Sequence, residues 1–296
     1  MAATGRLLAQ PSHENGKLKQ NQPVASLRLR AREHGAERLK NRMKIKLLPD
    51  YPYLYETHMH TNVGSACGRN SGAEMAAACR ECGYSGAFIT DHNWGGNTAI
   101  DRSLPWREWM TGFAGGYRDA KRYGDAHDMD IFFGMEAGFA GTEFLIYGLS
   151  PEWFIDHPEI REATIAEQYA LVHAAGGMVS QAHPYREEHY IPEVRVFPEY
   201  ADALETSNAT HSSPLSQGHN NPSWDDAARE LAARCGKPVT AGSDTHTTRL
   251  LGGGMAFRRR LKSAEDFCAA VLGGEDYILS DGRHWRRKDG EIMDVV

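Results

Sequence analysis

Five short segments of the chain place histidine or carboxylate side chains at the ends of apolar, β-prone runs. They are 56–61 (ETHMHT), 89–92 (ITDH), 134–136 (GME), 181–184 (QAHP) and 242–246 (GSDTH). Histidine and carboxylate together suit Zn²⁺, Mn²⁺ and Fe²⁺, whereas Ca²⁺ and Mg²⁺ sites consist mostly of oxygen ligands. Five such segments in one chain therefore predict a centre that holds more than one metal ion.

The spacing within these segments indicates what the metal ions would do. His58 and His60 are two residues apart, so on an extended strand both side chains point to the same face and can bind one ion. Asp244 and His246 repeat that spacing, and the carboxylate of Glu136 can bridge two ions. Metal ions a few ångströms apart activate water as hydroxide and bind the oxygens of a phosphoryl group. The pattern thus predicts a metal-dependent hydrolase.

Strands and helices must bring these segments together. Apolar, β-prone runs predict strands at 53–56, 86–90, 131–134, 144–147, 178–181, 203–205 and 239–241. Helical spacing predicts helices at 73–82, 103–123, 164–175 and 224–235, and 256–280 reads as a strand, a helix and a strand. Alternating strands and helices predict a parallel sheet or barrel, in which functional side chains follow the carboxyl ends of the strands. All five segments lie at such positions.

Length and charge bound the organisation of the chain. Its 296 residues suit one domain of about 250 residues plus appendages. Residues 1–46 carry eleven Lys or Arg and three Asp or Glu, a net charge of +8, which leaves −14 on the remaining residues. We expect 1–46 to be a basic, disordered leader, 47–282 to be the domain that carries the metal motifs, and 283–296 to be a short polar tail.

Cysteine usage and hydropathy favour a cytoplasmic protein. The five cysteines are odd in number, which is typical of reduced thiols, and Cys79 and Cys82 lack the second pair that would complete a zinc site. No apolar run approaches the roughly 20 residues of a membrane helix, and residues 1–46 lack the apolar middle of a secretory signal. We therefore expect no membrane partner.

The motifs HxH, TDH, GxE, AHP and SDxH, in this order, resemble those of the PHP (polymerase and histidinol phosphatase) domain family. The resemblance runs over residues 53–280. It implies an α/β fold, a distorted (β/α)7 barrel of the TIM type, that carries two or three divalent metal ions (Mn, Fe or Zn). It also implies a phosphatase or phosphoesterase that cleaves a small phosphomonoester, a nucleotide or an oligonucleotide with metal-bound hydroxide at a di- or trinuclear site.

The resemblance further implies which residues bind the metal ions. Seven ligands follow from it, namely His58, His60, His92, Glu136, His183, Asp244 and His246. Glu136 is implied to bridge a first ion to a second. His92 and His246 are implied to hold a third ion or to complete the cluster.

One stretch departs from the family pattern. Many members carry an aspartate or a further histidine shortly after the HxH motif, whereas residues 61–68 contain neither and contain Cys67 instead. As a thiolate, Cys67 would replace the missing ligand and favour Zn²⁺ or Fe²⁺; otherwise the third site is weak or empty. Glu205 and Asn208 match an E-x-x-N pattern of the family, and Asn208 or His211 stands where some members have one more ligand.

Catalytic and substrate-binding roles complete the expected site. We assign catalytic roles to Asp91, His92 and Arg186, and Asp91 would either orient a ligand or act as a base. Arg69, Arg186 and Arg249 each follow a metal motif, and phosphate groups bind such cations. These three arginines are therefore the expected contacts for a phosphorylated substrate.

Two other functions compete with the phosphoesterase. An amidohydrolase that cleaves C–N bonds also opens with HxH on a barrel strand, but it commonly uses a bridging carboxylated lysine, and this chain has no lysine between Lys121 and Lys237. A non-catalytic metal-binding or nucleic-acid scaffold is the other alternative. The acidic charge of residues 47–296 opposes duplex binding there, so any nucleic-acid contact would fall to the basic leader.

Overall fold

The structure is a computed structural model that describes residues 44–216 and 218–296. The expected basic leader, and with it the predicted nucleic-acid contact, lies outside the described residues apart from positions 44–46. No helix in these two ranges combines the length and the apolar composition needed to cross a bilayer.

Strands and helices alternate over the first two thirds of the described chain. The strands are β1 (Tyr53–Glu56), β2 (Gly86–Ile89), β3 (Asp130–Phe139), β4 (Thr142–Tyr147), β5 (Met178–Gln181), β6 (Ala203–Asn208), β7 (Val239–Gly242), β8 (Gly253–Phe257), β9 (Tyr277–Asp281), β10 (His284–Arg286) and β11 (Ile292–Val295). The α-helices are α2 (Gly72–Cys82), α3 (Trp106–Phe113), α4 (Gly115–Ala126), α5 (Pro151–Asp156), α6 (Ile165–Ala174), α7 (Ala209–Ser212), α8 (Ser223–Cys235) and α9 (Ala264–Leu272), and two 3₁₀ turns are η1 (Pro158–Glu162) and η2 (Pro198–Tyr200).

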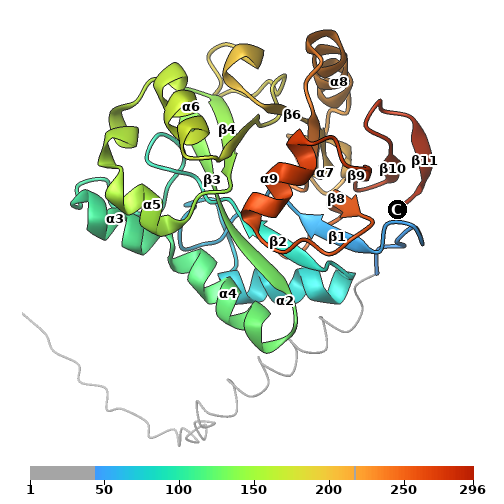
Figure 1. Cartoon of the computed structure of the whole chain (residues 1–296), viewed down its shortest axis with the longest axis horizontal. Coiled ribbons are helices and arrows are strands. Elements are labelled where there is room, and N and C mark those ends of the chain that lie inside the picture. The colour runs from blue at the N-terminus through green and yellow to red at the C-terminus, as the bar shows by residue number, and fades with distance from the viewer. Residues whose placement is uncertain (1–43, 217) are drawn as a thin grey trace, which may run out of the picture. The chain divides into compact units, whose positions relative to one another are not determined.

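The described strands form one curled sheet in the order β11-β10-β9-β8-β1-β2-β3-β4-β5-β6-β7 (Figure 1). Strands β1, β2 and β3 are parallel, as are β5, β6 and β7. Strand β4 is antiparallel to both β3 and β5, and β8 to β11 are antiparallel to their neighbours, so the sheet is mixed and not purely parallel. The predicted α/β fold, a distorted barrel of the TIM type, is confirmed.

Backbone contacts close the curl where the first and last parallel strands end. Met59 and Thr245 form a parallel bridge, and the Thr245 carbonyl accepts a hydrogen bond of 2.9 Å from the amide of His60. A Cβ atom on Gly253 would overlap the carbonyl of Gly242, so only glycine allows β7 and β8 to approach this closely. The first and last metal motifs therefore lie in register beside each other.

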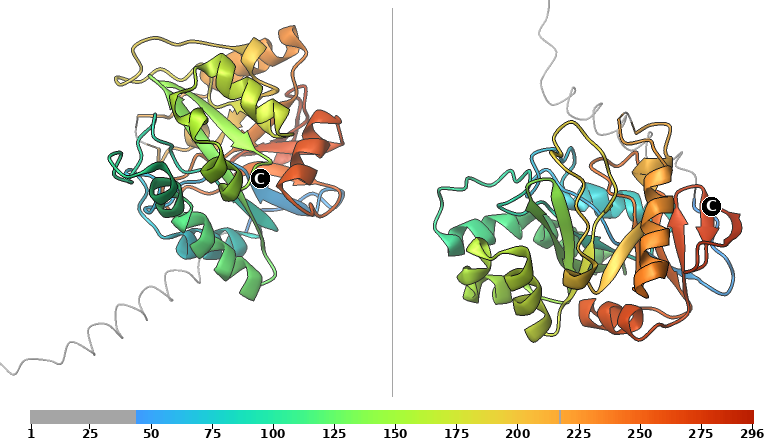
Figure 2. Two further views of the ribbon diagram at one scale, coloured as in Figure 1. Left: turned by 60° about the vertical axis from the view of Figure 1, so that its left-hand side comes forward. Right: turned by 90° about the horizontal axis from the view of Figure 1, so that it is seen from above.

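Helices cover the outside of the sheet (Figure 2). Helices α2 and α4 pack beside each other against β2 and β3, while α3, α5 and α6 cover β3, β4 and β5. Helix α2 begins at the expected cap, where Ser71 and Glu74 form a capping box, and ends at Gly83 in the left-handed region (φ 99°). On the inside, Phe267 of α9 contacts Phe88 and Tyr147 at ring-centroid distances of 4.8 and 5.1 Å.

The single helix expected at 103–123 is two helices, α3 and α4, which meet at Ala114. The glycine pair 115–116 accounts for the break, because glycine weakens a continuous helix and permits close packing. A Cβ atom on Gly116 would overlap the Thr61 hydroxyl, which lies directly after the HxH motif. The break thus lets α4 approach the metal loop.

The segment 283–296, which the sequence sets apart as a polar tail, adds β10 and β11 to the sheet. Trp285 is fully buried, and its indole donates to the carbonyl of Lys46 at 2.9 Å. Lys46 also forms an ion pair of 2.7 Å with Asp294. This C-terminal segment is therefore part of the domain.

We expect Gly116→Ala to destabilise the fold by roughly 1–3 kcal/mol, because the added methyl group must displace Thr61 from a packed position. Gly112→Ala is the matched control one turn earlier, since its Cβ would meet only Ile100, at an ordinary 3.6 Å. The control should be neutral or more stable by up to about 1 kcal/mol. Chemical denaturation of both variants tests this, and equal effects would contradict the role assigned to Gly116.

Candidate metal centre

The five predicted segments meet at one end of the barrel, beyond the carboxyl ends of the parallel strands. His58 and His60 follow β1, His92 follows β2, and His183 follows β5. Glu136 lies within β3, past the residues that pair with β2, and Asp244 and His246 follow β7. The ligands predicted on separate strands are thus brought together.

The carboxylate of Glu136 lies at the middle of this cluster and is fully buried. Its Oε1 lies 3.1 Å from Nε2 of His58 and 3.1 Å from Nε2 of His183. Its Oε2 lies 2.7 Å from Nδ1 of His92 and 3.5 Å from Nε2 of His60. Four imidazoles from three strand ends therefore converge on one carboxylate, as a ligand that bridges two ions requires.

A second carboxylate, Asp244, faces the same histidines. Its Oδ1 lies 3.5 Å from Nε2 of His58 and 3.3 Å from Nε2 of His60. Asp244 (φ 51°) and His183 (φ 28°) both have a positive φ, a conformation that costs a residue other than glycine on the order of 1–3 kcal/mol. Such backbone strain is typical of functional sites, where the direction of a side chain is fixed by its role.

Unpaired buried atoms test whether these residues fit a metal ion. Across the described ranges, His58 Nε2, His60 Nε2, His92 Nδ1 and Glu136 Oε2 are buried and make no hydrogen bond, although each has a ligand atom close by. Buried polar atoms without partners cost free energy. Ligand atoms that share one ion at about 2.0–2.2 Å stand about 3–3.5 Å apart, which is the spacing found here. The residues fit a divalent metal centre.

Among the residues that the structure describes, four groups of three side chains each have ligand atoms within 4.8 Å of one another. They are His58, His60 and Glu136; His58, His183 and Asp244; His60, His92 and His246; and His92, Glu136 and Glu143. The groups overlap, since His58, His60, His92 and Glu136 each belong to two of them.

The protonation states of the ligands differ. Burial would lower the pKa of His58 and His92, but the charges of nearby carboxylates, first Asp244 for His58 and Glu136 for His92, raise it well above its ordinary value, so a metal ion would displace a proton from each. Burial lowers the pKa of His60 well below its ordinary value and that of His183 to about 4, which keeps both imidazoles neutral. Burial would raise the pKa of Glu136, but the charge of His58 holds it well below the usual range. Neutral imidazoles and ionised carboxylates are the forms that coordinate metals.

Buried residues outside the cluster orient the ligands. Glu205 accepts from Nδ1 of His58 at 2.9 Å and from the amide of His183 at 3.0 Å, and Asn208 donates to Glu205 at 3.1 Å. Partners of this kind fix the tautomer and direction of a metal-binding histidine. Glu205 and Asn208, the two residues of the E-x-x-N pattern, therefore orient the ligands His58 and His183 through hydrogen bonds.

Asp91 does not lie where a base would meet the substrate. It accepts hydrogen bonds from the amide of Thr61 at 2.6 Å, the Thr61 hydroxyl at 2.7 Å and the Ser65 hydroxyl at 2.7 Å, and it does not line the cavity. Ser65 in turn contacts Nδ1 of His60 at 3.1 Å. Of the two roles predicted for Asp91, these hydrogen bonds favour orientation of a ligand over that of a base, and its catalytic role stays a prediction.

The sequence reasoning missed Glu143 on β4. Its carboxylate lies 3.6 Å from Nδ1 of His92 and 3.5 Å from Nε2 of His183, and it lines the cavity. Burial and the nearby charge of Glu136 raise the pKa of Glu143 to about 7. The local signal is only an acidic residue at the start of a strand, because the β3–β4 pairing that brings it here is not visible in the sequence.

Cys67 lies beside His92 and His246 but belongs to none of the groups of three ligand atoms found among the described residues, so its role as a ligand stays a prediction. Burial would raise the pKa of the Cys67 thiol, but hydrogen bonds with His246 and His92 lower it to about 6. A thiolate next to two imidazoles suits a borderline metal such as Zn²⁺.

A cavity of about 730 Å³ opens onto the centre. His92, Asp244 and His246 line it, together with Arg69 and Arg186. Arg186 is buried, whereas Arg69 is exposed. Arg249 is exposed and does not line the cavity, so the structure brings two of the three predicted arginines to the site.

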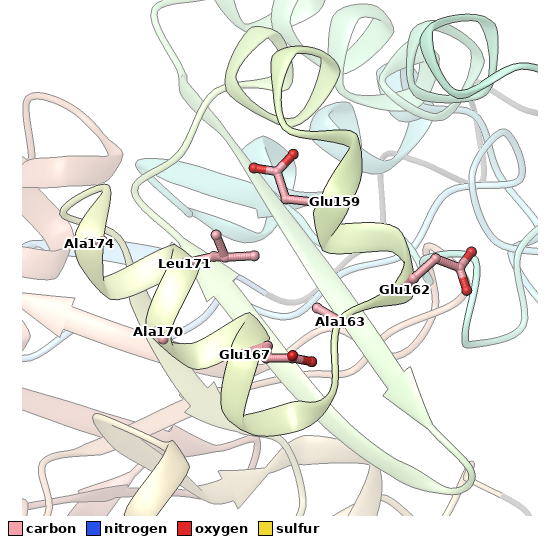
Figure 3. Close-up of a pocket in the computed structure, with 7 residues that line it drawn as sticks. All are labelled: Glu159, Glu162, Ala163, Glu167, Ala170, Leu171 and Ala174. Carbon is pink, nitrogen blue, oxygen red and sulfur yellow. The ribbon is translucent and has the colours of Figure 1, made fainter.

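A second cavity, of about 480 Å³, lies between η1 and α6 and contains none of the candidate ligands (Figure 3). Glu159, Glu162 and Glu167 surround its apolar floor at Leu171. Glu167 belongs to the capping box of α6, which explains its position structurally.

The sequence matches the PHP domain family over residues 56–240 and a PHP-associated region over 222–275. The chain belongs to the PHP domain family. This PHP domain therefore carries a cluster of His, Glu and Asp side chains that could bind metal ions. No curated protein matches the chain at a significant level.

One solved structure shares the fold of this PHP domain, and others match it more weakly. A two-domain protein from Bacteroides vulgatus, which contains a predicted PHP-like metal-dependent phosphoesterase, is 12% identical with a TM-score of 0.58, over 81% of this chain and 68% of that one. PsfC from Pseudomonas syringae is 16% identical (TM-score 0.49; 73% and 87% covered). An amidohydrolase from Chromobacterium violaceum with bound sulfate and no metal is 13% identical (TM-score 0.41; 65% and 87% covered). The likeness to the Bacteroides vulgatus protein supports the fold alone.

Glu136→Gln removes the negative charge at the middle of the cluster while it preserves the side-chain shape. We expect the metal content to fall below one ion per chain and the metal affinity to drop beyond the ~10–100-fold typical of residues that only support a ligand. Elemental mass spectrometry after chelator-free purification measures this. His127→Ala, an exposed histidine on another part of the domain, is the control and should retain full metal content; an unchanged Glu136→Gln would contradict the assignment.

Metal binding should protect Cys67 from alkylation. In chelator-treated protein, a thiol with a pKa of about 6 reacts quickly with iodoacetamide at pH 7 and slows as the pH falls below 6, because the thiolate is the reactive form. Adding Zn²⁺ should slow the reaction at Cys67 at least about tenfold if the thiolate becomes a ligand. Peptide mass spectrometry separates this from the exposed Cys235, whose labelling should not respond to metal. Equal labelling of Cys67 with and without metal would remove it from the ligand set.

Proposed function

We propose that this PHP domain hydrolyses a small phosphoester, either a phosphomonoester or a nucleotide-sized compound, at a centre of at least two divalent metal ions. The observation that carries the proposal is the cavity in which metal ligands and a buried arginine share one wall. A volume of about 730 Å³ suits a small organic molecule, which typically occupies a cavity of about 300–1,000 Å³.

Each ion would have its own set of ligands. His58, His60, Glu136 and Asp244 would hold the first ion, and Glu136 with His183 would hold the second. His92 and His246, with Cys67, would hold the third. Bound Mn, Fe or Zn ions supply Lewis-acid chemistry, which activates water and neutralises the charge of a phosphoryl group.

The protein's own residues would bind and orient the substrate. Arg186 presents a fixed cation in the cavity wall, and Arg69 stands at the cavity mouth on a segment whose amide donates to the carbonyl of His246 at 2.9 Å. An arginine can bind two phosphoryl oxygens at once, which orients the group as well as attracting it. Burial of Arg186 strengthens this interaction, because it is shielded from water.

The amidohydrolase alternative has less support from the centre. The position where such enzymes commonly place a carboxylated lysine is taken by Glu136, and no lysine occurs between Lys121 and Lys237. The scaffold alternative is opposed by the complete set of converging ligands, since a centre without a catalytic role has no need of strained residues such as Asp244.

Two substrates that release the same leaving group, p-nitrophenol, test the proposal. We expect the protein, reloaded with Mn²⁺ or Zn²⁺ after chelation, to release p-nitrophenol from p-nitrophenyl phosphate, with a kcat/KM far above that for the acetyl ester. His58→Ala should lower the phosphatase rate on the order of 10³-fold, since it removes several kcal/mol of metal-derived stabilisation, whereas His127→Ala should not.

Turnover of p-nitroacetanilide without turnover of the phosphate would instead favour C–N hydrolysis. No turnover of either compound or of a panel of mononucleotides by fully metal-loaded protein would favour the scaffold.

A further inference from the structure

Arg186 is the starting point, because a buried guanidinium needs partners on every side. Its Nη2 donates to Oδ2 of Asp244 at 2.5 Å, and its Nε donates to Nε2 of His211 at 3.1 Å. The side chain is only 6% exposed, yet it lines the cavity. Among the described residues around that cavity, it is the one buried lysine or arginine.

The contact with His211 continues to a second carboxylate. Nδ1 of His211 lies 2.6 Å from Oδ1 of Asp225, and the other oxygen of Asp225 accepts from the amide of Asn208 at 3.1 Å. His211 is fully buried and Asp225 is 3% exposed. These residues come from α7 and α8, far from the five metal motifs in the sequence.

The hydrogen bonds that link Arg186, His211 and Asp225 allow only one assignment of donors and acceptors. A guanidinium can only donate, so Nε2 of His211 accepts, and the proton of the imidazole is on Nδ1, where it is donated to Asp225. Asp225 therefore fixes the tautomer of His211, and His211 fixes one edge of the guanidinium. Asp244 holds another edge, so the direction of the guanidinium within the cavity is determined.

A purely structural role explains the burial less well. Apolar side chains of similar size generally stabilise a protein interior as much as a buried ionic network or more. Here the network ends at a cation on the wall of a cavity next to a candidate metal ligand. A cation held at that point is suited to an anionic group of a ligand that also contacts the metal centre.

We propose that His211 and Asp225 are positioning residues that hold the Arg186 guanidinium in the cavity as the binding site for an anionic oxygen of the substrate. The proposal deepens the phosphoesterase proposed above and rests on it for the identity of the anion. His211 and Asp225 act through Arg186 and do not contact the substrate.

Binding of inorganic phosphate to the metal-loaded, full-length protein tests this by calorimetry. Arg186→Gln should weaken phosphate binding about 10–100-fold, as loss of a charge-assisted contact does. Asp225→Asn, which is nearly isosteric, and His211→Ala should each weaken it by about fivefold or more. With a chromogenic phosphate ester, these two variants should raise KM more than they lower kcat.

The decisive readout is the double variant. In an Arg186→Gln background, Asp225→Asn and His211→Ala should change phosphate affinity less than about twofold, because the residue through which they act is gone. Asp226→Asn is the matched control, since Asp226 is the neighbouring aspartate on α8, exposed and paired with Arg229. It should bind phosphate like the unmodified protein. Metal content and thermal unfolding confirm that each variant is loaded and folded.

Unchanged phosphate affinity in Asp225→Asn and His211→Ala would overturn the proposal. Losses that persist in full without Arg186 would also overturn it, as would an unmodified protein that binds no phosphate. Failure of the phosphoesterase proposal would look different: phosphate would bind and depend on Arg186, His211 and Asp225, but no phosphoester would be cleaved.

Discussion

The buried carboxylate of Glu136 is the interaction on which the rest of the centre depends. Four imidazoles from three strand ends point at its two oxygens, and several of these atoms lack hydrogen bonds in the described structure. Such a cluster is unfavourable unless cations share its ligands, because unpaired buried polar groups are costly. Selection for metal binding, and not for stability of the metal-free fold, explains why these side chains are gathered in one place.

Close backbone contacts within the barrel bring the ligand side chains together. The bridge between Met59 and Thr245 aligns the first and last metal motifs, and glycines at 242 and 253 allow β7 to approach His58 and β8 closely. His183 and Asp244 hold strained backbone conformations that direct their side chains inward. Hydrogen bonds from Arg186 to Asp244 and from the amide of His183 to Glu205 help to hold these conformations.

Much of the fold and the centre could be predicted because the signals are local. The alternation of His58 and His60 and the capping box of α2 each depend on residues that are close in sequence. Glu143 could not be predicted in this way, because it reaches the centre through antiparallel pairing of β4 with β3. Asp225 likewise meets His211 only once α8 has packed on the sheet. Pairing and packing over long sequence distances are the information that local patterns lack.

The central claim is that Glu136 bridges two metal ions. Anomalous diffraction from crystals of the metal-loaded protein tests it most directly, because it locates each ion without reference to activity. The account predicts two or more anomalous peaks about 3.5–4 Å apart, the separation typical of two-metal sites, on either side of the Glu136 carboxylate. A single ion that Glu136 does not contact, or ions bound elsewhere on the chain, would contradict it.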